Sequence, residues 1–241
     1  MNPLKTLVND KTSGSLELTL KLNNILKKTK DTKEIVIILN EVEKNLKGFS
    51  AVDNYISKVN EYLSTKSVSS LQTFFNEFEL EIKNTITVIF EKAKLSIGQY
   101  ETFFTLSNSF TLFEVLKKLN AIKKIEVFIC ESEPACEGVI LAEKLKSFKI
   151  NLKVIKDSEM SVYIPNSDVI LLGADKILNN GDIINKSGSY SAALIASNFN
   201  KPVYVIGDKS KFYKNADKNN LFKNNLFEVV PAKLITKIIT D

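Results

Sequence analysis

The residues best suited to chemistry in this chain follow directly after apolar, β-branched runs. One run ends at Cys130 and continues as Glu131-Ser-Glu-Pro-Ala-Cys-Glu-Gly138, and another ends at Leu172 and continues as Gly173-Ala-Asp175. Ligands bind outside the carboxyl ends of parallel strands, so both turns are expected at one edge of a sheet. Glycine lets the backbone approach a ligand, and a helix that begins there offers free N–H groups to an anion. We therefore expect a ligand site at this edge.

Two charged residues stand out in these turns. Asp175 follows a buried strand, where a carboxylate is costly unless it has partners. It either binds a hydroxyl or transfers a proton, or it caps the next turn, and we favour a binding role. Asn185 and Lys186 precede a helix expected at Ser187–Asn198. A lysine beside a helix N-terminus suits a phosphate, because dipole and charge both attract the anion, but an exposed lysine without a role is an equal alternative.

The composition limits the chemistry that these residues can perform. All 33 basic residues are lysines, and the chain contains no arginine, histidine or tryptophan. A phosphate must therefore be held by lysines and backbone amides, without the two-pronged guanidinium contact. Histidine acid–base catalysis is excluded. We expect no metal site and no cofactor.

Length and charge indicate an ordinary soluble protein. The 241 residues are 44% hydrophobic and 25% charged, with a net charge of +5 that is scattered along the chain. Nucleic-acid binding is therefore not favoured. For the lysine-rich stretch Lys201–Lys223, we favour a solvated surface loop over the alternative of a contact with phosphate or RNA. No apolar run has the length of a membrane span, no secretory signal is recognised, and two cysteines make no disulfide framework. These features predict a cytoplasmic protein.

The hydrophobic pattern predicts an α/β protein with an N-terminal helical domain followed by a Rossmann-like parallel α/β domain. Residues 1–98 repeat apolar positions at a spacing near 3.6 and are expected to form a helical bundle. Residues 99–241 alternate apolar strands with helices, the pattern of right-handed crossovers in a parallel sheet. The expected strands are Thr102–Leu106, Lys124–Cys130, Ile150–Ile155, Asp168–Leu172 and Pro202–Ile206.

Several of these segments also carry a family resemblance. Gly173-Ala-Asp175, Asn180-Gly-Asp182, Asn185-Lys186 and Gly188 together resemble the signature of the translation initiation factor 2B family. Glu131-Ser132, Pro134 and Glu137-Gly138 resemble the loop Glu-Ser-Arg-Pro-x-x-Glu-Gly of that family. The family contains the α, β and δ regulatory subunits of the exchange factor. It also contains isomerases of methylthioribose-1-phosphate and ribose-1,5-bisphosphate.

The resemblance implies which residues form the site, and it also shows departures. Isomerase members use a cysteine in a Thr-His-Cys-Asn context and the aspartate of Gly-Ala-Asp. Here Leu106 and Ser107 stand in place of the histidine and the cysteine, and an alcohol without a base passes a proton poorly. We expect Ser107 to cap the helix that begins near Ser109. Glu133 replaces the loop arginine, which disfavours a bisphosphate. The ligand-binding residues expected from the resemblance are Ser107, Asn108, Glu131, Ser132, Gly173, Asp175, Asn185 and Lys186.

The resulting functional hypothesis is a non-catalytic regulatory or assembly protein that binds a nucleotide or sugar phosphate. Its partners are expected to be a second copy or a paralogue, which would make a homodimer or heterodimer through the α/β domain. The alternative is a sugar-phosphate aldose–ketose isomerase, with Asp175 as the catalytic residue. A plain RNA-binding module is less favoured, because the sequence has no aromatic–basic motif.

Overall fold

The computed structural model describes residues 2–10, 12–47, 49–65, 68–213 and 226–241. It divides into two compact units, Met1–Thr85 and Ile86–Asp241. Helix α5 (Val68–Ile97) contributes to both units, so the division falls inside this helix. The boundary expected after residue 98 corresponds instead to the end of the helix.

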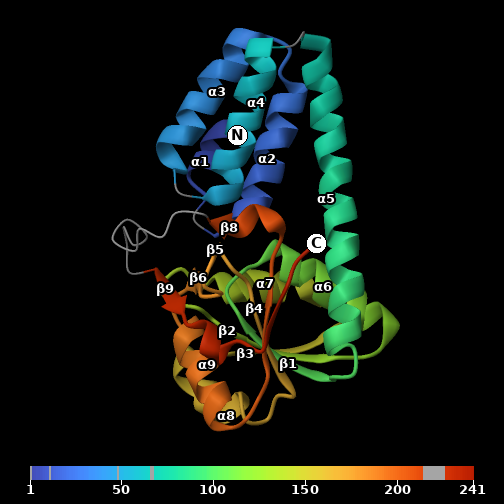
Figure 1. Cartoon of the computed structure of the whole chain (residues 1–241), viewed down its shortest axis with the longest axis vertical. Coiled ribbons are helices and arrows are strands. Elements are labelled where there is room, and N and C mark those ends of the chain that lie inside the picture. Colours follow the sequence, from blue (N-terminus) through green and yellow to red (C-terminus); the bar gives the residue numbers. More distant parts are fainter. Residues whose placement is uncertain (1, 11, 48, 66–67, 214–225) are drawn as a thin grey trace. The chain divides into compact units, whose positions relative to one another are not determined.

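The first unit is a helical bundle made of α1 (Pro3–Val8), α2 (Ser15–Lys28), α3 (Thr32–Asn45), α4 (Ser50–Thr65) and the first part of α5 (Figure 1). The helices form because leucine, isoleucine and valine recur on one face of each, and the buried faces pack into one core. A polar group is accommodated inside this core because all its hydrogen-bonding atoms are paired. The buried Asn23 donates to the carbonyl of Phe75 at 3.0 Å and accepts from the hydroxyl of Tyr55 at 2.6 Å.

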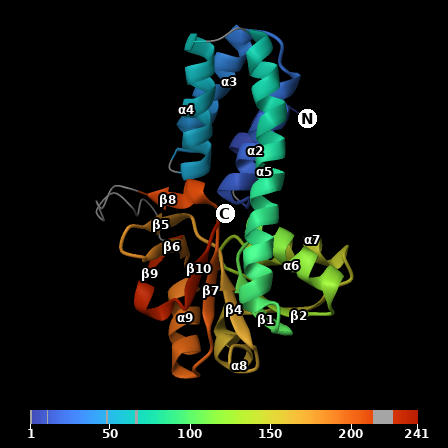
Figure 2. The ribbon, with the colours of Figure 1, turned by 45° about the vertical axis from the view of Figure 1, so that its right-hand side comes forward.

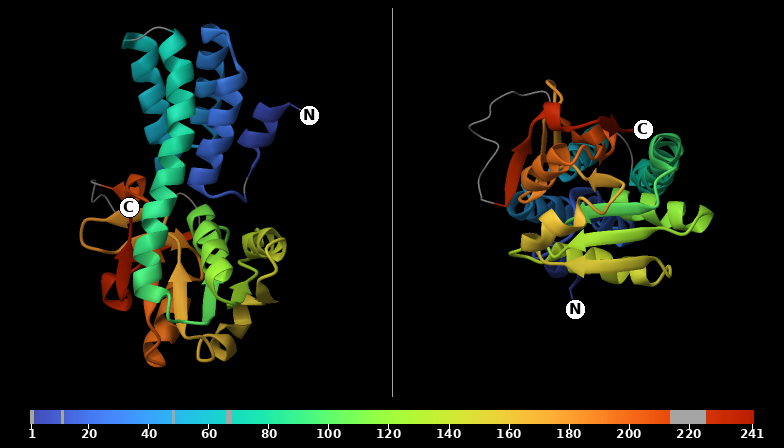
Figure 3. Two further views of the ribbon diagram at one scale, coloured as in Figure 1. Left: turned by 90° about the vertical axis from the view of Figure 1, so that its right-hand side faces the viewer. Right: turned by 90° about the horizontal axis from the view of Figure 1, so that it is seen from below.

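The second unit is built on a six-stranded sheet in which every strand is parallel to its neighbours. The strand order is β10-β7-β4-β1-β2-β3, which can be followed in Figure 2 and from two further sides in Figure 3. The predicted Rossmann-like fold is therefore confirmed. The strands are β1 (Thr102–Leu106), β2 (Glu126–Cys130), β3 (Asn151–Ile155), β4 (Val169–Leu172), β7 (Val203–Ile206) and β10 (Lys237–Ile239).

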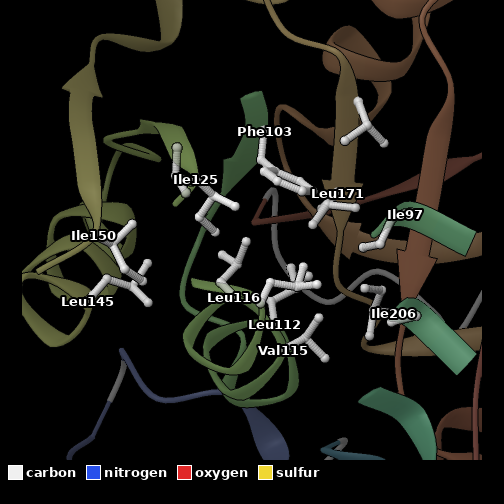
Figure 4. Packing of buried hydrophobic residues seen from close by; sticks show 14 of the residues in the cluster. Ile97, Phe103, Leu112, Val115, Leu116, Ile125, Leu145, Ile150, Leu171 and Ile206 are labelled. Atoms are coloured by element: carbon white, nitrogen blue, oxygen red, sulfur yellow. The ribbon is translucent and has the colours of Figure 1, made fainter. Parts of the chain in front are cut away.

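Helices cover both faces of this sheet, as buried parallel strands require. Successive residues point to opposite faces, so Phe103 packs into one core and Phe104 into the other. The first core joins the strands to α6 (Phe110–Ile122), α7 (Glu137–Lys146) and the last turns of α5, and Figure 4 shows part of its packing, including Phe103, Leu116 and Leu171. The second core contains α8 (Met160–Tyr163) and α9 (Ser189–Asn198).

A second, smaller sheet lies within the same unit and was not expected from the sequence. Its order is β8-β5-β6-β9, with β5 (Lys176–Leu178), β6 (Ile183–Lys186), β8 (Phe212–Tyr213) and β9 (Phe227–Val230). Gly181 makes the turn between β5 and β6 possible because its φ of 84° is open to glycine at low cost. Asn185 and Lys186 precede a helix as expected, but they form the end of a strand, and the helix begins at Ser189, two residues later than the expected Ser187.

Within the described residues, no helix combines the length and the apolar composition that crossing a bilayer requires.

Candidate functional site

The expected site residues gather at the carboxyl edge of the large sheet. Ser107 and Asn108 follow β1, Glu131 and Ser132 follow β2, and Gly173 and Asp175 follow β4. The small sheet brings Asn185 to the same edge, since a Cβ added to Gly173 would lie 3.7 Å from its Oδ1 atom. The main-chain N–H of Asp175 also donates to the carbonyl of Ile184 at 2.8 Å. Parallel topology thus brings together residues that are up to 79 positions apart, from 107 to 186.

The turns after β1 and β2 are tied together by a serine. Ser107 and Ser132 both adopt a left-handed conformation, with φ of 64° and 65°. The N–H of Ser107 donates to Oγ of the buried Ser132 at 2.7 Å, and that hydroxyl donates to the carbonyl of Cys130 at 3.1 Å. The expectation that Ser107 caps α6 is wrong. The cap is Ser109, whose Oγ accepts from the N–H of Leu112 at 3.3 Å.

Asn108 is also held by the protein itself. Its side chain is buried, and its Oδ1 atom accepts from Nζ of Lys144 at 3.2 Å. Lys144 lies on α7, so this bond links the turn after β1 to a helix that covers the sheet. These contacts fix the position of Asn108 and leave its role toward a ligand as an expectation.

The part of the edge that follows β2 and β3 is acidic. Asp157 accepts from the N–H groups of Ser132 and Glu133 at 3.1 and 2.8 Å, which shapes the loop. Glu131, Glu133 and Glu159 lie beside it, and Glu133 is exposed. Negative charge therefore accumulates around Glu133, the position at which the resembled family has an arginine. A phosphate is repelled from this end of the edge.

Both thiols of the chain lie in this acidic region, and both are free. Burial raises the pKa of Cys130 far above its usual range, and Asp157 raises it further. The pKa of Cys136 is also raised, first by desolvation and then by Glu131 and Glu133. A thiolate is the reactive form of cysteine, so neither residue is prepared for catalysis.

Asp175 occupies the opposite, lysine-rich part of the edge. Its side chain is partly exposed, yet it is enclosed closely enough that burial raises the pKa of its carboxyl. The charges of Lys211, Lys186 and Lys176 oppose this effect and lower the pKa. No hydrogen bond from the described residues reaches the carboxylate. Asp175 is therefore an acceptor with free capacity, suited to a ligand hydroxyl.

Lys186 is neither exposed nor unpaired. Its Nζ donates to Oε1 of Glu137 at 2.6 Å, and the two side chains are only 4% and 8% exposed. The alternative of a solvent-exposed lysine is therefore wrong. The carboxylate partner offsets the positive charge that a phosphate at this point would contact.

Sequence reasoning missed Lys211. It lies at the end of the short 3₁₀ helix Lys209–Lys211 after β7, it is buried, and its charge acts on Asp175. It belongs to the stretch interpreted as a solvated loop, of which residues 214–225 lie outside the described part. The sequence did contain a signal near Lys211: Gly207-Asp208 follows an apolar strand directly, as Gly173-Ala-Asp175 does.

The described side chains contain no group of three or more histidine, cysteine, aspartate or glutamate residues placed to hold a metal ion. What the edge offers is a carboxylate with free acceptor capacity among lysines, next to a loop rich in carboxylates. This arrangement is suited to a polar small molecule with one anionic group, held through charge and hydrogen bonds.

A helical unit combined with a Rossmann-like unit, whose candidate site residues line the carboxyl edge of the sheet, defines a class of proteins with one common fold. The chain belongs to the initiation factor 2 subunit family, whose family model matches residues 3–224. This membership confirms the resemblance found in the sequence.

Relatives with different activities share this membership. The chain is 30% identical over 159 residues to a putative translation initiation factor eIF-2B subunit 2-like protein of Pyrococcus abyssi, covering 60% of this chain and 58% of that protein. It is 29% identical over 164 residues to ribose 1,5-bisphosphate isomerase of Methanocaldococcus jannaschii, covering 58% and 53%. The matches thus span little more than half the length of these curated relatives.

Solved structures show the same fold. Translation initiation factor eIF-2B of Pyrococcus horikoshii superimposes with a TM-score of 0.80 at 23% identity, covering 99% of this chain and 93% of that one. The 5-methylthioribose 1-phosphate isomerase of the same organism gives 0.77 at 18%, covering 99% and 82%. Because factor and enzyme match almost equally well, the fold does not distinguish their functions.

Proposed function

We propose that the chain is a non-catalytic regulatory or assembly member of its family that binds a phosphorylated small molecule at the carboxyl edge of its sheet. The observation that carries this proposal is the environment of Ser107. This residue stands where isomerases of the resembled family place their cysteine, and its main chain is fixed by Ser132. The chain has no histidine to activate the hydroxyl, and its two thiols, Cys130 at the end of β2 and Cys136 in the loop that follows, have raised pKa values.

A ligand with one phosphate suits the charge distribution best. Lys211 supplies positive charge on the side of Asp175, together with Lys186, whose charge Glu137 partly offsets. Glu131 and Glu133 supply negative charge after β2. A monophosphate, such as a nucleotide or a pentose phosphate, can be placed against the lysines with its hydroxyls at Asp175. A second phosphate would have to lie against carboxylates, at a cost in binding free energy.

Assembly with a family member is the second part of the proposal. A tetrameric complex of the eIF2B β and δ subunits of Chaetomium thermophilum has the same fold, with a TM-score of 0.68 at 19% identity and coverage of 99% of this chain and 87% of that one. By analogy, we propose that this chain forms a homodimer, or a heterodimer with a paralogue, in the cytoplasm. Light scattering at tens of micromolar checks this, and a monomer alone and with relatives would contradict it.

A sugar-phosphate isomerase is the second candidate, and a specific observation favours it. Asp175 is present in the Gly-Ala-Asp context, and burial raises the pKa of its carboxyl, which is the direction that proton transfer by a carboxyl requires. Ribose 1,5-bisphosphate isomerases and a methylthioribose-1-phosphate isomerase are also among the similar curated proteins.

The two candidates are separated by measuring turnover. The purified protein is incubated with ribose-1,5-bisphosphate and with methylthioribose-1-phosphate, and the ketose products are followed by NMR. We expect no conversion by the unmodified protein. Turnover that disappears in Asp175→Asn would establish the isomerase and end the non-catalytic proposal. Ser107→Cys serves as a comparison, because it restores the thiol in the family position.

The charge argument has its own test, by calorimetric titration. We expect ribose 5-phosphate to bind more tightly than ribose-1,5-bisphosphate. Glu133→Arg should reverse this order, because it restores a cation in the loop and removes a carboxylate. Glu143→Arg is the matched control, since Glu143 is also exposed and lies on α7 away from the loop. Equal changes in both variants would show that only net charge matters.

A further inference from the structure

Glu137 carries a buried oxygen atom for which the fold supplies no donor. Its Oε1 atom accepts from Nζ of Lys186 at 2.6 Å, while its Oε2 atom is buried without a hydrogen-bond partner among the described residues. Buried carboxylate oxygens are normally satisfied, because leaving one unpaired costs free energy. Asp157, in the same region, shows the usual arrangement, since each of its oxygens accepts a main-chain N–H.

The position of Glu137 is fixed rather than adjustable. It is the first residue of α7, and the next residue, Gly138, lies so close to β2 that an added Cβ would be 1.7 Å from the carbonyl oxygen of Cys130. The N–H of Gly138 also donates to the carbonyl of Glu131 at 3.0 Å. The main chain at Glu137 is therefore held against β2, and the bond from Lys186 holds its carboxylate.

The neighbouring acceptor points to the kind of group that would complete this oxygen. Glu137 and Asp175 lie close enough for their charges to interact, and both have free acceptor capacity within the described structure. Two acceptors beside a lysine match a molecule that carries hydroxyl donors next to an anionic group. A simple anion matches poorly, because one carboxylate repels it and the other already holds the lysine.

We propose that Glu137 determines the specificity of this site: it holds Lys186 and offers Oε2 to a ligand hydroxyl, so that polyhydroxylated monophosphate esters bind more tightly than plain phosphate esters. This inference rests on the proposed function, in so far as it places a phosphorylated ligand at this edge. It adds the residue that selects the ligand and the chemical class selected.

The experiment compares ribose 5-phosphate with methyl phosphate, two monoesters that differ in their hydroxyl groups. Both are titrated calorimetrically into the unmodified protein and into Glu137→Gln. We expect the unmodified protein to prefer ribose 5-phosphate by about tenfold or more, the effect of one hydrogen bond to a charged group. In Glu137→Gln, methyl phosphate should bind more tightly, because Lys186 is released, and the preference should fall to about threefold or less.

Equal affinities in the unmodified protein, an unchanged preference in Glu137→Gln, or no binding of either ester would each overturn the inference. If Glu137→Gln does not fold, the double variant Glu137→Gln with Lys186→Gln, which buries no charge at these positions, takes its place. It should bind both esters weakly and without preference, and a retained preference would overturn the inference. Isomerase turnover would refute the non-catalytic role alone, because the preference between the two esters does not depend on catalysis.

Discussion

Two aspartates lie at opposite ends of strand β4, and they differ in their hydrogen bonds and in the direction of their pKa shifts. Asp168 precedes the strand, and its Oδ2 atom accepts from the main-chain N–H groups of Glu101 and Thr102, each at 2.9 Å. These bonds lower the pKa of Asp168, the bond from Thr102 most strongly. Asp175 follows the strand, its carboxylate accepts no hydrogen bond from the described residues, and burial raises its pKa.

We interpret this difference as the one between a structural carboxylate, Asp168, and a candidate site carboxylate, Asp175. A carboxylate that accepts hydrogen bonds from the main chain stabilises the folded state, whereas an enclosed carboxylate without donors destabilises the folded state. Groups of the second kind persist where a ligand or a reaction requires them. Glu137 lies between the two cases, because one of its oxygens is bonded to Lys186 and the other is not.

The largest loss of stability is expected when Glu137 is left without its hydrogen-bond donor, Lys186. In Lys186→Met the buried carboxylate loses its ion-pair partner, and breaking a buried pair from one side costs about 3–5 kcal/mol of unfolding free energy. Urea unfolding followed by circular dichroism measures the loss. Lys146→Met is the matched control, because its pair with Glu143 is 56% and 62% exposed, and we expect no measurable change there. Similar losses in both variants would contradict the assignment of Lys186 as a buried partner.

A smaller loss of unfolding free energy is expected at Asp168, the carboxylate that accepts main-chain hydrogen bonds. Asp168→Asn keeps an acceptor but removes the charge, so the exposed site should lose about 1 kcal/mol at pH 7. Because the pKa of Asp168 is lowered in the folded state, this stabilisation is present above the usual value of 3.8 and disappears as the pH falls through the folded pKa. Urea unfolding at pH 7 and at the lowest pH where the protein remains folded should show the difference shrinking. A pH-independent difference would mean that the charge is not the cause.

The structural elements behind this comparison were only partly predictable from the sequence. Five of the six strands of the large sheet were predicted, because continuous apolar runs such as Val169–Leu172 are typical of buried parallel strands. The sixth, β10, was not predicted. The hairpin of β5 and β6 was missed because its strands have three and four residues and lie among turn-forming residues. The pairing of Glu137 with Lys186 depends on contact across 49 positions, which no local pattern encodes.

The site residues divide in the same way. Asp175 and Gly173 were found because small and acidic residues followed an apolar strand directly. Lys211 was overlooked because lysine-rich segments are usually solvated, and only the return of the chain after β7 buries this one. Local chemistry can therefore identify candidates, but tertiary contacts decide which charges are neutralised.

The smallest effect, and the one of opposite sign, is expected at Asp175. Its pKa is raised in the folded state, so the folded protein holds this proton more tightly than the unfolded chain does. The resulting destabilisation is absent below the usual value of 3.8 and grows as the pH rises through the folded pKa. Asp175→Asn should therefore raise the unfolding free energy by about 0.5–1 kcal/mol at pH 7, and this gain should vanish in acid. The same variant should bind ribose 5-phosphate more weakly, because the amide accepts a hydroxyl less strongly than a carboxylate. Gain in stability with loss of binding, measured by urea unfolding and calorimetry, is the pattern of a residue kept for its ligand. A loss of stability like that of Asp168→Asn would instead place Asp175 among the structural carboxylates.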